Sequence, residues 1–160
     1  MYNKNETCCF TGHRDIPAAL RQKIDNALKD EILSAYGLGI RTFIAGGAIG
    51  FDMMAAQAVL SLKNSYPDIT LTLAIPCRDH DAKWSNKAKS EFAEIKKNAD
   101  EITYVSESYH QGCMFKRNRY MIDRSCICIS YCTRSTGGTR YTVDYALSSG
   151  IELREISSLL

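Results

Sequence analysis

Short apolar runs alternate along the chain with longer stretches in which apolar residues recur at helical spacing. The runs predict six strands, over residues 7–10, 42–45, 69–75, 101–105, 126–131 and 151–156. Between them, the spacing predicts five helices: one from near Asp15 to Gly37, an alanine-rich one ending near Lys63, and three over about 84–98, 112–124 and 138–149.

The first helix carries the plainest periodicity. Apolar residues recur every four positions at Leu20, Ile24, Leu28 and Ile32, which gives one apolar stripe along a helix. Strands that alternate with helices of ten to fifteen residues are typical of βαβ units and a parallel sheet. We therefore expect a Rossmann-like α/β fold with a mainly parallel sheet, helices on both faces, and the last strand at one edge.

The length and composition narrow the class of protein. With 160 residues, 45% of them hydrophobic and 24% charged, the chain suits one globular domain over residues 1–160 rather than a disordered polymer. A net charge of +2 offers no broad electrostatic footprint for nucleic acid, although a local basic patch remains compatible with it. The apolar runs are too short to span a membrane, and we expect no membrane partner.

The seven cysteines predict a reducing environment. Their count is odd, the first ten residues lack the long apolar segment of a signal peptide, and no pair of C-x-x-C motifs is present. We therefore expect reduced thiols that are dispensable for ligand binding, a cytoplasmic location, no metal site and no cofactor.

Residues that could bind a ligand or take part in catalysis gather where the predicted strands end. The sequence Gly12-His13-Arg14 follows the first strand, residues 46–52 follow the second, and residues 133–139 follow the fifth. Arg117, Asn118 and Arg119 lie in the helix before the fifth strand. Because ligands of open α/β sheets bind at the carboxyl ends of the strands, we expect a site here.

Two glycine turns open helices at this edge. The Gly46-Gly47-x-x-Gly50 turn allows close backbone approach and directs helix amides at an anion, but tight packing explains it equally well. It lacks the Lys-Ser/Thr of a P-loop and does not match the dinucleotide fingerprint. A second turn, Thr136-Gly137-Gly138-Thr139, makes a nucleotide phosphate a better hypothesis than either turn alone.

Each candidate side chain also has a plainer interpretation. His13 is a titratable donor beside Arg14, or a hydrogen-bonding loop histidine. Arg117 and Arg119 are ligand-binding cations or solvated helix charges, and Asp52 is a ribose ligand or a carboxylate at a helix start. In the same way, Asp144 is a catalytic or a surface acid, and Trp84 is a stacking platform or packs in the core or a lid.

Taken together, these residues resemble the YpsA-like family of the SLOG superfamily. The resemblance spans nearly the whole chain and rests on Gly12-His13-Arg14, Gly47-x-x-Gly50-x-Asp52, Ile75-Pro76, Trp84, Asn118-x-x-Met121-x-Asp123 and Gly137-Gly138-Thr139.

Two further groups resemble parts of the same chain. DprA-type DNA-processing proteins have a Ser-Gly-x-x-x-Gly-x-Asp turn similar to residues 45–52, an Arg-Asn-Arg run similar to residues 117–119, and a Ser-Gly turn similar to Thr136-Gly137. LOG phosphoribohydrolases have an Arg-x-x-x-Met helix similar to Arg117–Met121 and a Pro-Gly-Gly turn similar to residues 136–138. Of the two acidic positions in the LOG motif, this chain keeps only one, as Asp144, and has Val143 at the other.

The resemblance implies a nucleotide-derived ligand at the glycine turns. It places Gly12, His13, Arg14, Gly46, Gly47, Gly50, Asp52, Arg117, Asn118, Thr136, Gly137, Gly138 and Thr139 around that ligand. A sensor or regulatory protein, compatible with a homo-oligomer, ranks first. An N-glycoside hydrolase of nucleoside monophosphates that uses Arg117 and Asp144 ranks second, and single-stranded DNA binding ranks third.

Overall fold

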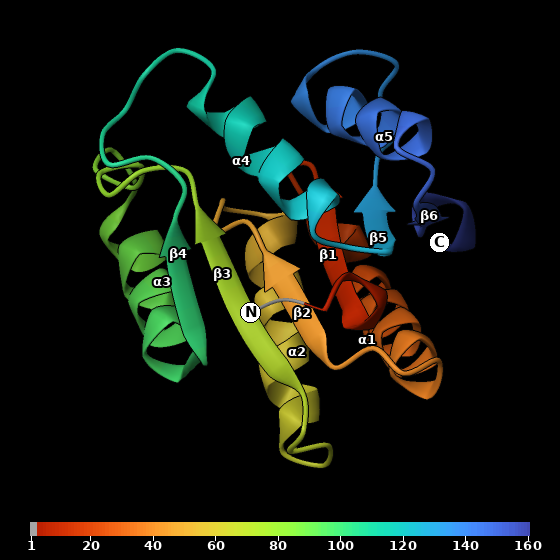
Figure 1. The fold of residues 1–160 in the computed structure, drawn as a ribbon. Coiled ribbons are helices and arrows are strands. Elements are labelled where there is room, and N and C mark those ends of the chain that lie inside the picture. Colours follow the sequence, from red (N-terminus) through yellow and green to blue (C-terminus); the bar gives the residue numbers. More distant parts are fainter. Residues whose placement is uncertain (1–2) are drawn as a thin grey trace.

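A computed structural model describes residues 3–160 and contains a six-stranded sheet in which every strand runs parallel to its neighbours (Figure 1). The strands are β1 (Thr7–Gly12), β2 (Thr42–Ala45), β3 (Thr70–Ile75), β4 (Glu101–Tyr104), β5 (Ile127–Tyr131) and β6 (Glu152–Glu155). Their spatial order is β4-β3-β2-β1-β5-β6. The expected Rossmann-like α/β fold is confirmed, and β6 lies at an edge as predicted.

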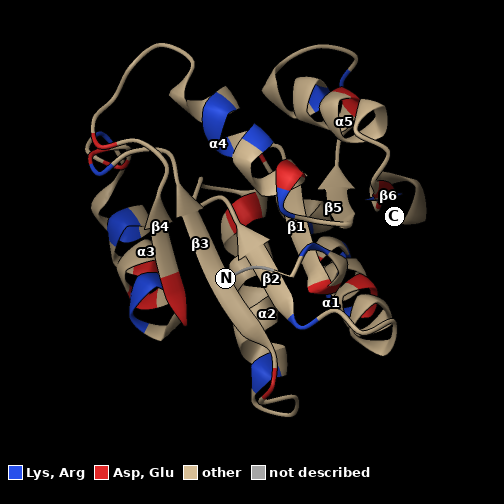
Figure 2. Cartoon of the chain, in the orientation of Figure 1, with Lys and Arg blue, Asp and Glu red and all other residues tan. Residues whose placement is uncertain are grey.

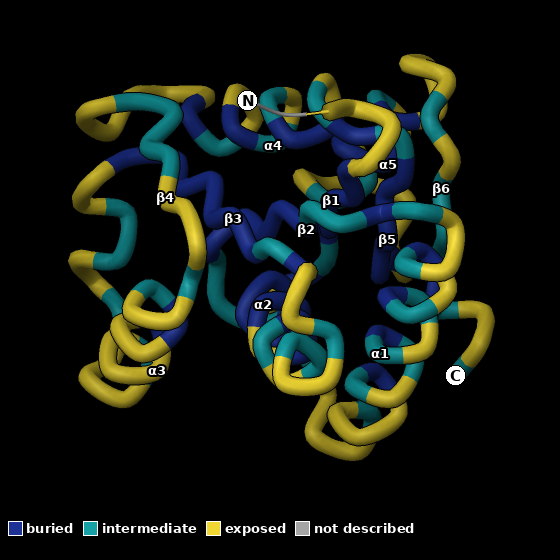
Figure 3. The backbone as a smooth tube through the Cα atoms, turned by 60° about the horizontal axis from the view of Figure 1, so that its bottom comes forward, coloured by how far each residue is buried: buried dark blue, intermediate teal, exposed yellow. Residues whose placement is uncertain are grey.

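Within the described residues, five α-helices cover the two faces of this sheet. They are α1 (Arg21–Gly37), α2 (Phe51–Lys63), α3 (Asn86–Asn98), α4 (Cys113–Asp123) and α5 (Gly138–Ser148). Helices α1, α2 and α3 lie on one face, and α4 and α5 lie on the other (Figure 3). This division follows from right-handed crossovers, because the chain moves outward from β1 to β4 and then returns to place β5 on the other side of β1.

The first helix begins later than the sequence predicts. Residue Pro17 is extended (φ −58°, ψ 129°), a 3-10 turn follows over Ala18–Leu20, and α1 starts only at Arg21. Ile16 packs partly against the hydrophobic core, so the extended segment before the helix is itself anchored. The earlier helix start was predicted from local capping residues, which carry no information about this tertiary contact.

The core lies in two layers, one on each side of the sheet. The predicted stripe of α1 is buried at Ile24, Leu28 and Ile32 and belongs to the larger cluster under α1, α2 and α3. The smaller cluster under α4 and α5 includes Met121 and Ala146. Figure 3 shows the central strands as the most buried part of the chain.

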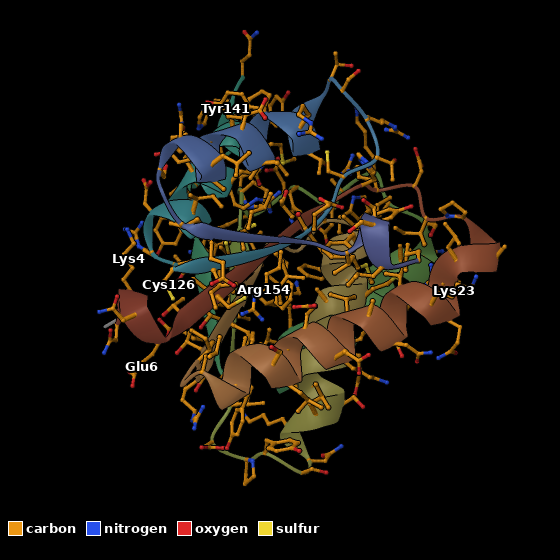
Figure 4. All side chains as sticks on the ribbon, turned by 90° about the vertical axis from the view of Figure 1, so that its right-hand side faces the viewer. Lys4, Glu6, Lys23, Cys126, Tyr141 and Arg154 are labelled. Atoms are coloured by element: carbon orange, nitrogen blue, oxygen red, sulfur yellow. The ribbon has the colours of Figure 1, made fainter. Side chains whose placement is uncertain are left out.

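Edge strand β6 is tied to the helix below it by one side chain. Arg154 Nη1 contacts Glu31 Oε2 at 3.3 Å and donates to Ser34 Oγ at 3.0 Å, both on α1 (Figure 4). These two side-chain contacts hold the edge strand against α1 without adding another strand to the sheet.

The cysteines add little reactive chemistry, and the described residues provide neither a metal site nor a membrane-spanning helix. All seven cysteines are free thiols and six of them are buried, and burial raises the pKa of Cys77 to about 11. Within residues 3–160, no group of three or more His, Cys, Asp or Glu side chains could hold a metal ion. In the same part of the chain, no helix is both long enough and apolar enough to cross a membrane.

Candidate functional site

A cleft lies at the carboxyl ends of β1 and β5, where the strand order reverses. Chain connections leave β1 and β5 toward opposite sides at this point, which is where open α/β sheets bind ligands. The cleft has a volume of about 310 Å³. Its lining comes from the end of β1 and the loop after it (Thr11, Gly12, Arg14, Asp15), the turn into α2 (Ala48, Asp52), α4 (Met114, Arg117, Asn118) and the segment opening α5 (Arg134, Gly138, Thr139).

A larger hollow of about 960 Å³ lies elsewhere, between α2 and α3. It is an open groove lined by helix side chains such as Gln57, Lys63 and Glu94, and no strand end contributes to it. The cleft between β1 and β5 is therefore the better candidate for specific chemistry.

A buried arginine forms one wall of the cleft. Arg117 is only 4% exposed, and its Nη1 donates to the carbonyl of Gly46 and to that of Ala74 at 3.3 Å. Its Nε donates to Asn118 Oδ1 at 2.8 Å. Burial lowers the pKa of Arg117, but arginine titrates so far above neutrality that the side chain keeps its charge. The interpretation of Arg117 as a solvated helix charge is therefore wrong.

Asp52 is the buried acid next to this arginine. Its Oδ2 accepts from the amide of Ala48 at 3.3 Å, and the side chain is 6% exposed. Burial raises the pKa of Asp52, while the charge of Arg117 opposes that shift. In this buried site, the charge of the Arg117 guanidinium partly offsets that of the Asp52 carboxylate.

The first glycine turn is built for close packing. A Cβ at Gly46 would lie 2.6 Å from Asp52 Oδ2 and 2.9 Å from Arg117 Nη1. Gly50 has φ +81° and meets the carbonyl of Arg14, and Gly47 packs against Phe92. None of these three glycines lines the cleft, so at this turn the structure favours the packing interpretation.

The second glycine turn is open. Gly137 has φ +100° and precedes α5 without a side-chain cap, and a Cβ at Gly138 would meet nothing within 4 Å. The first amides of a helix have no intrahelical partner, and here Gly138 and Thr139 line the cleft. Thr136 and Gly137 are exposed beside it but do not line it.

Asn118 connects the two helices that border the cleft. Its Nδ2 donates to Thr142 Oγ1 at 2.9 Å, and that hydroxyl donates to the carbonyl of Gly138 at 3.0 Å. Because Asn118 also accepts from Arg117, one amide holds the buried cation and the start of α5 in a fixed relation.

His13 connects two loops and does not line the cleft. Its Nε2 accepts from the amide of Thr133 at 2.9 Å, and its ring lies edge-on to Tyr131 with centroids 5.5 Å apart. Burial lowers the pKa of His13, so the neutral ring is the form that the fold favours. The hydrogen-bonding interpretation of this residue therefore matches its contacts.

Two further arginines reach the cleft from exposed loops. Arg14 was expected there, whereas Arg134 was not singled out from the sequence. Arg134 is 3.7 Å from Asp15, and both side chains are well exposed, so the pair is weak. The only sequence signal for Arg134 is its place in the loop after the fifth strand.

Asp144, Arg119 and Trp84 lie outside this cleft. The Asp144 side chain is 63% exposed and lies 3.7 Å from Arg140, one turn earlier on α5. Arg119 is exposed on α4, and Trp84 packs edge-on against Phe92 with ring centroids 5.5 Å apart, as the core-packing interpretation predicted.

Solved structures with this fold include two DNA-processing proteins. DNA processing protein A from Helicobacter pylori, described for its single-stranded DNA binding mode, has a TM-score of 0.65 and 17% identity and covers 95% of this chain and 65% of its own. DprA from Streptococcus pneumoniae has a TM-score of 0.68 and 17% identity, covering 95% of this chain and 50% of its own. At such identity the likeness shows the fold alone.

Sequence relatives are closer. An uncharacterised SPbeta prophage-derived protein, YoqJ of Bacillus subtilis, is 34% identical over 116 residues, which cover 65% of this chain and 68% of YoqJ. The UPF0398 protein YpsA of the same species is 25% identical over 104 residues, or 64% of this chain and 58% of YpsA. The chain thus spans from about half to about two thirds of the length of these curated relatives. A family model described as the YspA SLOG family matches residues 2–152, and the chain therefore belongs to the YpsA family of SLOG proteins.

Proposed function

We propose that this protein binds a nucleotide or nucleotide-derived small molecule, with a phosphate of that ligand in the cleft between β1 and β5. A volume of about 310 Å³ lies at the lower end of small-molecule sites, so the cleft suits a phosphate and its sugar. The bound molecule would act as a signal, which makes the protein a sensor or regulator.

One observation carries this proposal: the buried guanidinium of Arg117 lines the same cleft as the uncapped first turn of α5. A buried cation is poorly screened by water, and free helix amides present partial positive charge to an anion. Arg14 and Arg134 add two exposed cations to the lining of the cleft. A phosphate would complete the hydrogen bonding of these donors.

The position of Asp144 argues for binding over N-glycoside hydrolysis. A hydrolase needs a carboxylate beside the scissile bond, and Asp144 is exposed, near Arg140 and outside the cleft lining. The buried acid that lines the cleft, Asp52, is already engaged by the Ala48 amide. We therefore rank hydrolysis below simple binding.

Single-stranded DNA is the second candidate ligand, because the solved structure of the H. pylori DNA-processing protein shares this fold. One phosphate of a strand would enter the same cleft. The net charge of only +2 gives no broad electrostatic attraction for a long strand. We rank the mononucleotide first on that ground.

Calorimetric titration with mono-, di-, cyclic and dinucleotides tests the proposal. Arg14→Gln should weaken binding roughly 10- to 100-fold, the worth of one hydrogen bond to a charged group. Gly138→Leu should abolish binding because the new side chain enters open space in the cleft. Lys89→Gln, an exposed cation on α3, is the matched control and should change nothing.

Three outcomes would count against the proposal. Absence of binding by every nucleotide would overturn it. Binding of oligothymidylate but of no free nucleotide would replace it with the DNA candidate. Release of free base from a bound monophosphate would instead restore the hydrolase hypothesis.

A further inference from the structure

Two aromatic side chains meet on the surface between α4 and α5. Phe115 is 41% exposed and Tyr141 is 39% exposed, and their ring centroids are 4.6 Å apart at an interplanar angle of 66°. Neither residue belongs to the buried clusters on the two faces of the sheet. Figure 4 shows Tyr141 on α5, at the end of the molecule away from α1. The demands of the core therefore do not explain this pair.

The pair lies on the two helix turns that also supply lining residues of the cleft. Phe115 follows Met114, a lining residue of α4, and the amide of Tyr141 donates to the carbonyl of Gly137 in the first turn of α5. The hydrogen bond from Asn118 to Thr142 holds the same two helix turns together. The two rings therefore belong to the same helix turns as lining residues of the cleft, although neither ring lines the cleft itself.

The geometry and charge around the rings suit a flat anionic ligand. In an edge-to-face pair, at least one ring keeps a face free of its partner, and both rings here are open to solvent. Arg119 Nη1 donates to Tyr141 Oη at 3.3 Å, and Lys116 is exposed next to Phe115. The acidic residue of α4, Asp123, lies at the far end of the helix (Figure 2). Nucleobases stack on aromatic rings regardless of sequence, and cations beside the rings favour an attached phosphate.

We propose that Phe115 and Tyr141 form a stacking platform for the nucleobase of the ligand whose phosphate enters the cleft. This inference rests on the proposed function and deepens it, because it assigns the recognition of the base to α4 and α5. A base-bearing ligand should then bind more tightly than its base-free counterpart.

Titration of adenosine monophosphate, thymidine monophosphate and ribose 5-phosphate against wild type and variants tests the platform. Phe115→Leu and Tyr141→Leu keep an apolar side chain but remove the ring, so each should weaken nucleotide binding roughly 5- to 150-fold. Both should leave the affinity for ribose 5-phosphate unchanged. Tyr109→Leu, an exposed tyrosine in the loop before α4, is the matched control and should bind like wild type.

The outcomes separate this platform from the phosphate site. If wild type binds nucleotides no better than ribose 5-phosphate, or if both leucine variants bind nucleotides like wild type, the platform is refuted while the phosphate site stands. If nothing binds, both proposals fall. Equal losses with a mononucleotide and with oligothymidylate would support the platform for either source of the base, and melting curves of each variant exclude a folding defect.

Discussion

Individual glycines at the strand ends serve two different purposes. Gly46 is buried against Asp52 and Arg117, so its missing side chain makes room for a charged pair. Gly138 borders open space at the start of α5, so its missing side chain keeps the cleft accessible. At similar places in the fold, one glycine is therefore required by close packing, whereas the other leaves the cleft open.

Alanine substitutions should separate these purposes. Gly46→Ala would place a methyl group 2.6 Å from Asp52 Oδ2 and should lower the free energy of unfolding by about 1–3 kcal/mol, as overpacking does. Gly138→Ala has room and should leave that free energy unchanged or raise it by about 0.4–1 kcal/mol. Urea unfolding of both variants measures the difference, and equal losses would contradict the assignment.

The sequence predicted the candidate residues better than their surroundings. The glycine turns marked the edge of the sheet at which the cleft lies, but nothing in the residues distinguished the packed turn from the open one. The burial of Arg117 did have a signal, because Cys113, Arg117 and Met121 recur every four residues and all three face inward. Such a stripe is normally apolar, and only the tertiary structure supplies the carbonyls that make a buried cation tolerable.

At the scale of elements, the site depends on how α4 and α5 are held together. The buried residues of α5 are Thr142, Val143 and Ala146, which places Asp144 on the outward side of the helix. The outward position of Asp144 was predictable from the helical spacing in the sequence. The resemblance to the LOG motif nevertheless made Asp144 a candidate catalytic acid. The inward position that matters for the site is Thr142, through Asn118.

Removing the hydroxyl of Thr142 should loosen this helix pair. Thr142→Val keeps the volume but removes the bonds to Asn118 and Gly138, and should lower the free energy of unfolding by about 1 kcal/mol. In an Asn118→Leu background the same change should cost less, because the partner is already gone. A double-mutant cycle in urea measures this coupling.

The control for this cycle is Ser148→Ala. Ser148 Oγ donates only to the carbonyl of Tyr145 within the same helix, so its loss should stay within about 0.5 kcal/mol and show no coupling to Asn118. Strict additivity of Thr142→Val and Asn118→Leu would show that the hydrogen bond between the helices contributes nothing.

At the scale of the whole molecule, two histidines connect neighbouring loops along the edge of the sheet that carries the cleft. His13 accepts from Thr133 and so connects the loops after β1 and β5. Nε2 of His80 lies 3.0 Å from the carbonyl of Gly47 and so connects the loops after β3 and β2. The parallel direction of the strands and the edge position of β6 were predictable from alternating patterns. The cross-loop contacts, by contrast, join residues far apart in the chain and leave no local pattern.

Both histidines should make the protein less stable in mild acid. Burial lowers the pKa of His13 and of His80 from the usual 6.5, so the folded state prefers both rings neutral. A proton on His13 would remove the acceptor for Thr133, and one on His80 would create a donor at Nδ1, which is buried without a partner.

As the pH falls below about 6.5, the unfolded chain therefore binds protons first, and the free energy of unfolding should drop by at most about 1.4 kcal/mol per pH unit for each histidine. Above that pH both states are neutral and the stability from these rings is fully present. Urea unfolding between pH 7.5 and 5 should show a clearly shallower slope in the His13→Gln/His80→Gln double variant than in wild type. The exposed His110→Gln serves as the control, and identical slopes in wild type and the double variant would refute the role of the two buried rings.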